Sequence, residues 1–185
     1  MPLESLFQTK NELKVLIRRA IAADAVALAE FGARTFYETF AADNTAEDMS
    51  RHLESAWSPA LQLAEIENPQ LDTLLVVDTA GVLAGFAQLD AGPAPECVAV
   101  RQPVELKRFY IDKPWQGRGL AGELMTAVEL AAQARGASGL WLGVWERNQR
   151  AQAFYRKCGF RMVGTKVFVV GTDPQTDHVM LKEIA

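Results

Sequence analysis

The second half of the chain alternates between short apolar strands and helix-like segments, and this alternation limits the folds open to it. Residues 104–111 and 140–145 have the apolar, β-branched and aromatic content of buried strands. Each is followed by a helical segment, 117–135 and 147–157, and each helical segment ends close to a glycine. Strands that alternate with helices in this way predict an α/β fold.

The first half of the chain predicts a strand, three helices and a hairpin. Asp24, Thr45 and Ser58 are polar residues of the kind that begin helices, with Asp48 completing a capping-box pattern and Pro59 at a first helical position. In order, we expect a strand at 13–18, three helices starting at those polar residues, a hairpin of 73–77 and 82–89, a loop at 91–102, and closing strands at 160–170 and 178–184. The pattern predicts a twisted mixed sheet of about seven strands flanked by helices.

The length of 185 residues predicts a single domain, residues 13–185, preceded by a flexible leader, residues 1–12. No apolar run approaches the roughly 18–20 residues that a membrane helix needs, and the first residues lack the apolar core of a signal peptide, so we expect a cytoplasmic protein without a membrane partner. Cys97 and Cys158 form no CxxC pair, and His52 and His178 lack the spacing of metal ligands. We therefore expect no metal.

The charges are unevenly distributed along the chain. Residues 36–72 contain eight acids and one base, whereas residues 101–166 contain twelve bases and five acids. The asymmetry fits two interpretations: solvated helix faces that differ in sign, or an anionic ligand bound by the second half and a cationic one drawn to the first. Nucleic acid is not an expected partner, because the chain is acidic overall and carries no binding motif.

A glycine-rich turn at residues 115–122 joins a predicted strand to a predicted helix. The free N–H groups and the dipole at a helix N-terminus favour a phosphate group, and glycines let it approach the backbone. Gly117, Gly119 and Gly122 also match G-x-G-x-x-G, but that dinucleotide fingerprint belongs in the first strand-to-helix turn of a doubly wound sheet. A turn that binds no ligand is the alternative.

At this turn the chain resembles a known family. Gln116-x-x-Gly119-x-Ala121 is similar to the R/Q-x-x-G-x-G/A signature of the GNAT N-acetyltransferase superfamily, and the resemblance extends over residues 104–160. Residues 35–40, residues 141–146 and Asp177 resemble bacterial Pai-type spermidine/spermine acetyltransferases. The resemblance implies a sheet whose two middle strands splay apart, with acetyl-CoA in the split.

The resemblance also implies which residues hold the acetyl-CoA co-substrate. The strand would contact the pantetheine, the turn would bind the pyrophosphate, and the next helix would contribute to both. The implied residues are Phe109, Tyr110 and Ile111 on the strand, Gln116, Gly117, Arg118, Gly119, Leu120 and Ala121 in the turn, and Asn148, Phe154 and Lys157 on or before the helix.

Two side chains are candidates for the chemistry. Transfer to an alkyl amine requires a proton to be removed from the ammonium, and the thiolate leaves more readily if a nearby O–H donates to it. Tyr155 matches the family's proton-donating tyrosine; a packed core aromatic is the alternative. Glu105 matches a strand position where some members carry a glutamate base that acts through water; an exposed structural carboxylate is the alternative.

For the acceptor we expect an apolar wall of Phe36, Tyr37 and Phe40, although such helix aromatics also suit a core. Glu38, Asp43 or another acid of residues 36–72 would attract a second ammonium group. The predicted function is direct acetyl transfer to a primary amine of a small polycation such as spermidine or spermine. Alternative acceptors are a protein N-terminus, a lysine or an amine antibiotic, and a non-catalytic acyl-CoA sensor is the alternative from another class. The oligomeric state, a homodimer included, stays open.

Overall fold

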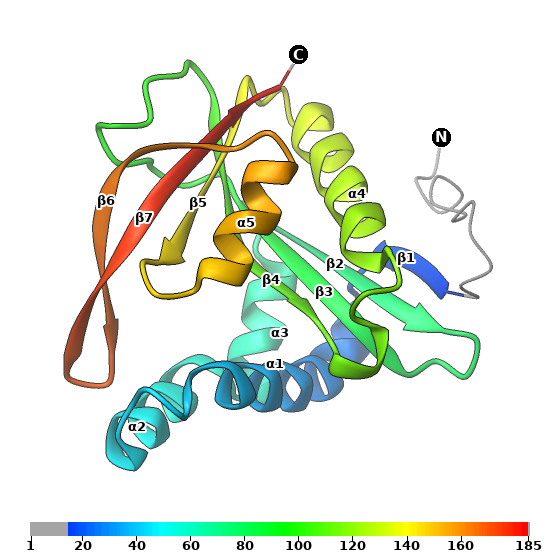
Figure 1. The fold of residues 1–185 in the computed structure, drawn as a ribbon. Coiled ribbons are helices and arrows are strands. Elements are labelled where there is room, and N and C mark those ends of the chain that lie inside the picture. The colour runs from blue at the N-terminus through cyan, green and yellow to red at the C-terminus, as the bar shows by residue number, and fades with distance from the viewer. Residues whose placement is uncertain (1–14, 185) are drawn as a thin grey trace.

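Seven strands form one mixed sheet in the order β1-β2-β3-β4-β5-β7-β6 in the computed structural model, which describes residues 15–184 (Figure 1). The strands are β1 (Val15–Arg19), β2 (Leu71–Asp78), β3 (Leu83–Asp90), β4 (Pro103–Ile111), β5 (Gly139–Trp145), β6 (Arg161–Val170) and β7 (Asp173–Glu183). Neighbouring strands run antiparallel except β4 and β5, which run parallel. The predicted α/β fold is confirmed, and the predicted leader, residues 1–12, lies outside the described residues.

Helices cover both faces of this sheet and divide the interior into two main cores (Figure 1). On one face, α4 packs Leu124 and Val128 against Leu140 of β5. On the other face, α1 packs Leu28 against Phe86 of β3. The helices are α1 (Ala25–Phe40), α2 (Ala46–Ala56), α3 (Pro59–Glu67), α4 (Leu120–Ala134) and α5 (Gln149–Lys157), with short 3-10 turns at η2 (Ala22–Asp24) and η3 (Lys113–Trp115). Within residues 15–184, none of the helices has the length and apolarity needed to cross a membrane.

The predicted helix starts are confirmed at α2 and α3. The Thr45 hydroxyl accepts the N–H of Asp48 at 3.1 Å, and the Ser58 hydroxyl accepts that of Leu61 at 3.2 Å. Asp24 stands at the N-cap of α1 but makes no cap bond to the helix, because its carboxylate instead binds Arg18 at 2.7 Å.

Helix α4 begins at Leu120, whereas the sequence pattern predicted a start at Gly117. Gly117 and Gly119 have φ angles of +76° and +88°, which lie outside the helical region. Residues 116–119 therefore form a tight turn before the helix. The unpaired N–H groups of the first turn of α4 follow directly after it.

The sheet splits between β4 and β5. These strands pair only through Pro103–Glu105 against Gly139–Trp141. Beyond these three pairs, β4 stays bonded to β3 and β5 to β7. A β-bulge at Lys107, which stands between the pairs Leu89–Leu106 and Gln88–Arg108, bends β4 at the point of divergence. The expected splay of the middle strands is thus present.

The hairpin of β6 and β7 reaches from the sheet toward α2, as Figure 1 shows. At its tip, the N–H and hydroxyl of Thr172 donate to the Asp48 carboxylate at 2.7 and 2.9 Å. Gln175 donates to the Asn44 side chain at 2.6 Å. The hairpin and α1–α2 therefore close one side of the split, opposite the side covered by α4 and α5.

Candidate active site

A cavity of about 360 Å³ and a larger one of about 730 Å³ lie within the described residues, and only the larger opens into the split. Its wall combines α1, β4, the glycine-rich turn, β5 and α5. Most residues predicted from sequence line it: Glu38, Phe40, Phe109, Tyr110, Ile111, Gln116, Gly117, Gly119, Ala121, Asn148, Phe154, Tyr155 and Lys157. A concave site with convergent polar groups is the usual form of a ligand site.

The glycine-rich turn presents free backbone donors to this cavity. The N–H groups of residues 117–121 make no close hydrogen bond within the described residues, whereas those of Gly122 and Glu123 donate to the Gly119 carbonyl. Successive free N–H groups at a helix N-terminus bind anions well. Of the other turn residues, Leu120 buries its side chain completely and Arg118 lies 5.7 Å from the Trp115 ring, outside the cavity wall.

The open edge of β4 faces the same cavity. Backbone groups alternate between the two sides of a strand. The N–H of Asp112 donates to Ala84 of β3, while the carbonyl of Ile111 turns to the split, where the Gln116 amide donates to it at 2.8 Å. By the same alternation, Phe109 presents its backbone groups to the split, and Tyr110 presents its own to β3. A bound chain can therefore add hydrogen bonds at Phe109 and Ile111.

Tyr155 of α5 places a half-buried phenol at the cavity wall. Its ring packs edge-on against Phe109 at 6.3 Å and Phe160 at 5.8 Å, and its hydroxyl has no hydrogen-bond partner among the described residues. Burial, followed by the neighbouring Tyr110 and Cys158, raises the pKa of Tyr155 far above its ordinary value. The phenol is protonated at neutral pH and has a hydrogen to donate.

Cys158 also lines the cavity, and burial is the main cause that raises the pKa of its thiol. Because the thiolate is the nucleophilic form, a thiol with a raised pKa is a weak nucleophile near neutral pH. The cavity therefore holds a proton donor at Tyr155 and no activated sulfur at Cys158.

Glu105 occupies the last position at which β4 and β5 pair, and it does not line the cavity. Its carboxylate accepts a hydrogen bond from Lys166 of β6 at 3.1 Å. The Lys166 ammonium also lies 5.0 Å from the Trp141 ring. The Glu105 carboxylate is thus paired with the ammonium group of Lys166.

The four predicted acceptor residues of α1 separate into two groups. Glu38 and Phe40 line the cavity, where Glu38 forms ion pairs with Lys113 at 3.3 Å and Arg34 at 3.4 Å. Phe36 is only 4% exposed and stacks on His52 in the core, while Tyr37 is 53% exposed on the outer surface. The structure therefore brings Phe36 and Tyr37 to places outside the cavity wall.

The structure adds residues for which the sequence gave no role. Arg150 donates to the Gln116 side chain at 2.6 Å and brings positive charge to the end of the cavity at the glycine-rich turn. Asp177 of β7 is buried but does not line the cavity. It lies on the same face of β7 as the buried Val179 and Leu181, and this spacing of two marks it as facing inward.

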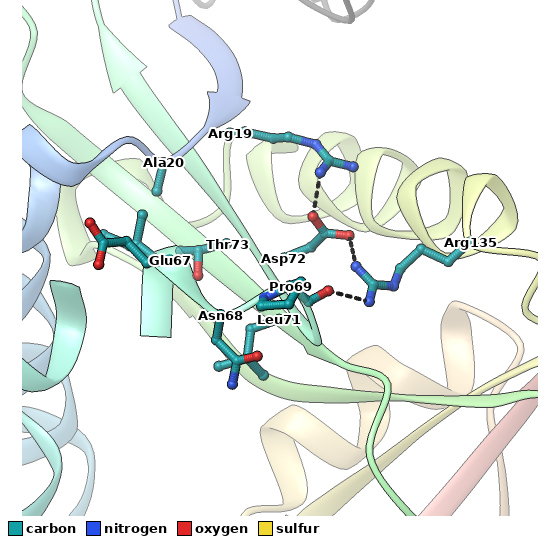
Figure 2. Close-up of a pocket in the computed structure, with 10 residues that line it drawn as sticks. Arg19, Ala20, Glu67, Asn68, Pro69, Leu71, Asp72, Thr73 and Arg135 are labelled. Atoms are coloured by element: carbon teal, nitrogen blue, oxygen red, sulfur yellow. Dashed lines mark hydrogen bonds and ion pairs between the residues drawn. The ribbon is translucent and has the colours of Figure 1, made fainter. Parts of the chain in front are cut away.

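Some of the charged residues that make the sequence asymmetric form ion pairs within the protein. Glu65 of the acidic stretch pairs with Arg108, which also lies 4.4 Å from the Trp57 ring. Asp72, at the smaller cavity, is held by Arg19 at 2.5 Å and Arg135 at 2.7 Å (Figure 2). The pairs Glu65–Arg108 and Asp72–Arg135 connect the acidic and basic stretches of the chain. The charge asymmetry of the sequence therefore does not by itself indicate the charges of the ligands.

Comparisons with known proteins agree with this geometry. The model of the acetyltransferase (GNAT) family matches residues 33–160. An uncharacterised N-acetyltransferase from Lactobacillus delbrueckii subsp. lactis is 36% identical over 151 residues, which are 81% of this chain and 86% of that protein. A spermine/spermidine N(1)-acetyltransferase from Bacillus subtilis is 30% identical over 105 residues, 56% of this chain and 65% of that protein. The crystal structure of PaiA N-acetyltransferase from Thermoplasma acidophilum in complex with coenzyme A has a TM-score of 0.75 at 22% identity, covering 92% of this chain and 99% of that one.

Proposed function

The chain belongs to the GNAT family of acetyltransferases, and from this premise we propose that it transfers acetyl from acetyl-CoA directly to a primary amine of a small polycation such as spermidine. The observation that carries the proposal is the split itself. One cavity joins a turn with free N–H donors, an unpaired strand edge and a half-buried, protonated phenol. These are the groups that a nucleotide thioester and its departing thiolate need.

The acetyl-CoA site is assigned to two features, the glycine-rich turn and the open edge of β4. The free N–H groups of residues 117–121 bind the pyrophosphate, and Arg150 and Lys157 bring positive charge near it. Phe109 and Ile111 bind the extended arm through their backbone, and Asn148 and Phe154 line its path. Asn148 keeps its amide nitrogen for this role, because its oxygen already accepts the N–H of Ala151 at 3.0 Å and begins α5.

Tyr155 is assigned as the general acid. Acetyl-CoA supplies an activated thioester, from which the sulfur leaves as a thiolate. The phenol of Tyr155 lies at the cavity wall with its hydrogen unused and donates it to that sulfur. The protonated thiol of Cys158 supports direct transfer over a route through an acetylated cysteine.

Two observations support the polyamine assignment. The Bacillus subtilis relative that acts on spermine and spermidine supports it, as does the acceptor end of the cavity, where Phe40 offers an apolar surface and Glu38 a carboxylate. Glu38 is already paired with Lys113 and Arg34, so an acceptor ammonium must share that carboxylate.

Free-thiol release from acetyl-CoA at pH 8 tests the proposal. The acceptor panel contains spermidine, spermine, lysine, a peptide with a free N-terminus and an aminoglycoside, with a reaction lacking any acceptor as the control. We expect release with the polyamines and background with the rest. Release with only the peptide, lysine or the aminoglycoside keeps the acetyltransferase and overturns the polyamine. Binding of acetyl-CoA without release for any amine overturns the proposed reaction.

A further inference from the structure

Tyr110 of β4 brings a second phenol to the active-site cavity, and the reaction proposed above does not use it. Tyr110 lines the cavity, and its hydroxyl makes no hydrogen bond within residues 15–184. Burial is the main cause that raises the pKa of Tyr110 to about 12, so the phenol is neutral near pH 7. A neutral phenol can donate one hydrogen bond and accept others. A polar group of this kind that has no protein partner calls for a specific explanation, and in a cavity a ligand is one.

The side chain of Tyr110 lies on the opposite face of β4 from those of its two neighbours. Successive side chains of a strand point to opposite faces of the sheet. Phe109 and Ile111 pack into the core that α4 and α5 cover, whereas Tyr110 packs into the core that α1 covers. Tyr110 therefore faces the side of the cavity to which α1 contributes Glu38 and Phe40. That is the side assigned to the acceptor.

The ring of Tyr110 is held in one position by buried aromatic neighbours. It stacks on Phe86 with ring centroids 5.5 Å apart and meets Trp57 edge-on at 6.4 Å. Phe86 is fully buried and Trp57 is only 7% exposed, so neither ring can move aside without opening the core. The hydroxyl of Tyr110 consequently has a fixed direction.

Electrostatic interactions indicate that this direction is across the split. After burial, the Arg108 guanidinium lowers the pKa of Tyr110 and the Asp177 carboxylate of β7 raises it. Burial and then Tyr110 raise the pKa of Tyr155 on α5. Because β4 and β5 do not pair beyond Glu105, both Asp177 and Tyr155 stand across the open part of the sheet from Tyr110. The Tyr110 hydroxyl therefore lies between the catalytic phenol and the acceptor side of the cavity.

The remaining polar side chains that α1 and β4 contribute to the cavity wall all have partners: Thr35, Glu38, Thr39, Lys107 and Arg108. The two threonine hydroxyls donate to backbone carbonyls of α1 at 2.8 and 2.7 Å. The three charged groups form ion pairs. Of the polar side chains of these two elements in the cavity wall, Tyr110 is thus the one without a protein partner in the described part of the chain.

We propose that the Tyr110 hydroxyl binds the acceptor nitrogen and directs it at the acetyl carbon. This inference rests on the proposed function and deepens it, because it assigns the side chain that positions the acceptor. The phenol oxygen accepts one N–H of the amine, which leaves the nitrogen lone pair free to face the thioester. Tyr110 exchanges no proton in this step. The two phenols of the cavity consequently serve different substrates: Tyr110 holds the attacking nitrogen, and Tyr155 protonates the departing sulfur.

The test compares Tyr110→Phe with Tyr37→Phe, the same change at an exposed tyrosine of α1. The kcat/KM is measured with the amine of the acceptor panel that the parent protein acetylates fastest. We expect it to fall about tenfold or more in Tyr110→Phe, because the variant loses a hydrogen bond to the acceptor nitrogen. The affinity for acetyl-CoA, measured by calorimetry, stays within about twofold, since the hydroxyl faces the other substrate. Tyr37→Phe keeps the parent values.

Two further readouts separate acceptor binding from a structural effect. The melting temperature of Tyr110→Phe equals or exceeds that of the parent, because a hydroxyl without a partner is removed and the ring contacts remain. In the double variant with Tyr155→Phe, the two fold-losses in kcat/KM multiply, since independent roles add in free energy. A double variant no slower than Tyr155→Phe alone means that Tyr110 acts only through Tyr155, and it overturns the inference.

The outcomes distinguish this inference from the function on which it rests. If the parent acetylates an amine, an unchanged kcat/KM, a lower melting temperature or a tenfold loss of acetyl-CoA affinity in Tyr110→Phe overturns the inference and leaves the acetyltransferase standing. If the parent acetylates no amine at all, both the proposed function and this inference fail. A loss confined to kcat/KM for the acceptor, multiplied in the double variant, supports the inference.

Discussion

At the scale of single residues, the site depends on side chains whose protonation is set by burial. Tyr155 and Asp177 are opposite cases of one cause: burial disfavours charge, which keeps the Tyr155 phenol neutral and makes the Asp177 carboxylate more basic.

Replacing Tyr155 with phenylalanine removes only the hydroxyl, and the ring contacts with Phe109 and Phe160 remain. We expect kcat to fall about 100-fold, the lower end of the usual range for a general acid, with the KM for acetyl-CoA within about twofold. Steady-state kinetics with the best acceptor of the panel measures both values. An unchanged kcat, with chemistry shown to limit turnover, removes Tyr155 as the acid.

Replacing Asp177 with asparagine is expected to stabilise the protein at neutral pH. Because the folded-state pKa of about 6 lies above the ordinary value of 3.8, the folded state binds more protons and loses stability as pH rises between these values. The cavity admits solvent that screens part of this effect, so we expect a gain of about 1–2 kcal/mol above pH 6. Urea unfolding at pH 3.5 and pH 7.5 measures it, and a gain of equal size at both pH values contradicts the assigned cause.

Some of these residues were predicted from the sequence and others were not, for a physical reason. Gln116 lies in the glycine-rich motif and Tyr155 in the later segment that resembles the family, so the resemblance predicted where both would lie. Phe36 and Tyr37 are neighbours on one helix, and only packing decides that one enters the core and the other meets solvent. The partner of Glu105, Lys166, comes from a strand 61 residues later, and no local pattern predicts that contact.

At the scale of elements, the turn before α4 is the clearest case of backbone shape serving the site. Gly119 is the N-cap of α4 with φ of +88°, a left-handed conformation in which a Cβ atom costs about 1–2 kcal/mol. The glycine-rich pattern predicted the turn itself. It did not predict that α4 starts only at Leu120, because the spacing of apolar residues along a helix does not indicate which glycine before it has a positive φ angle.

Replacing Gly119 with alanine strains this turn and displaces its N–H groups. We expect the affinity for acetyl-CoA to fall about tenfold or more, corresponding to about 1.4 kcal/mol, as measured by calorimetry. Gly81, in the turn between β2 and β3, has a similar φ of +80° with nothing near its Cβ position. Gly81→Ala therefore carries the same backbone strain without the site, and an equal loss of affinity in both variants contradicts the role of the turn.

At the scale of the whole molecule, buried ion pairs connect elements that are distant in sequence. Asp72 of β2 has a side chain only 4% exposed and binds Arg19 of β1 and Arg135 at the end of α4 (Figure 2). Arg135 also donates to the Pro69 carbonyl at 2.9 Å. The charge count along the sequence showed an excess of acids and of bases in different segments, and folding brings members of the two together.

Replacing Asp72 with alanine leaves two arginines beside a partly buried gap. Breaking a buried pair usually costs about 3–5 kcal/mol, and because Arg19 is half exposed we expect a loss near 3 kcal/mol in the free energy of unfolding. Glu183→Ala breaks the exposed pair with Arg161 and should change that energy by about 0–1 kcal/mol. Equal losses in the two variants, measured by urea unfolding, would show that the Asp72 cluster contributes no more than a surface pair.

The three-pair junction between β4 and β5 has a consequence for how this fold can change over evolutionary time. Past that junction, the gap between the half-sheets is bridged by side chains and helices, not by a continuous ladder. Substitutions that widen or narrow the gap therefore break no strand–strand hydrogen bond. A lineage can remodel the acceptor end for amines of different size while the donor end and the stability of both half-sheets are inherited unchanged.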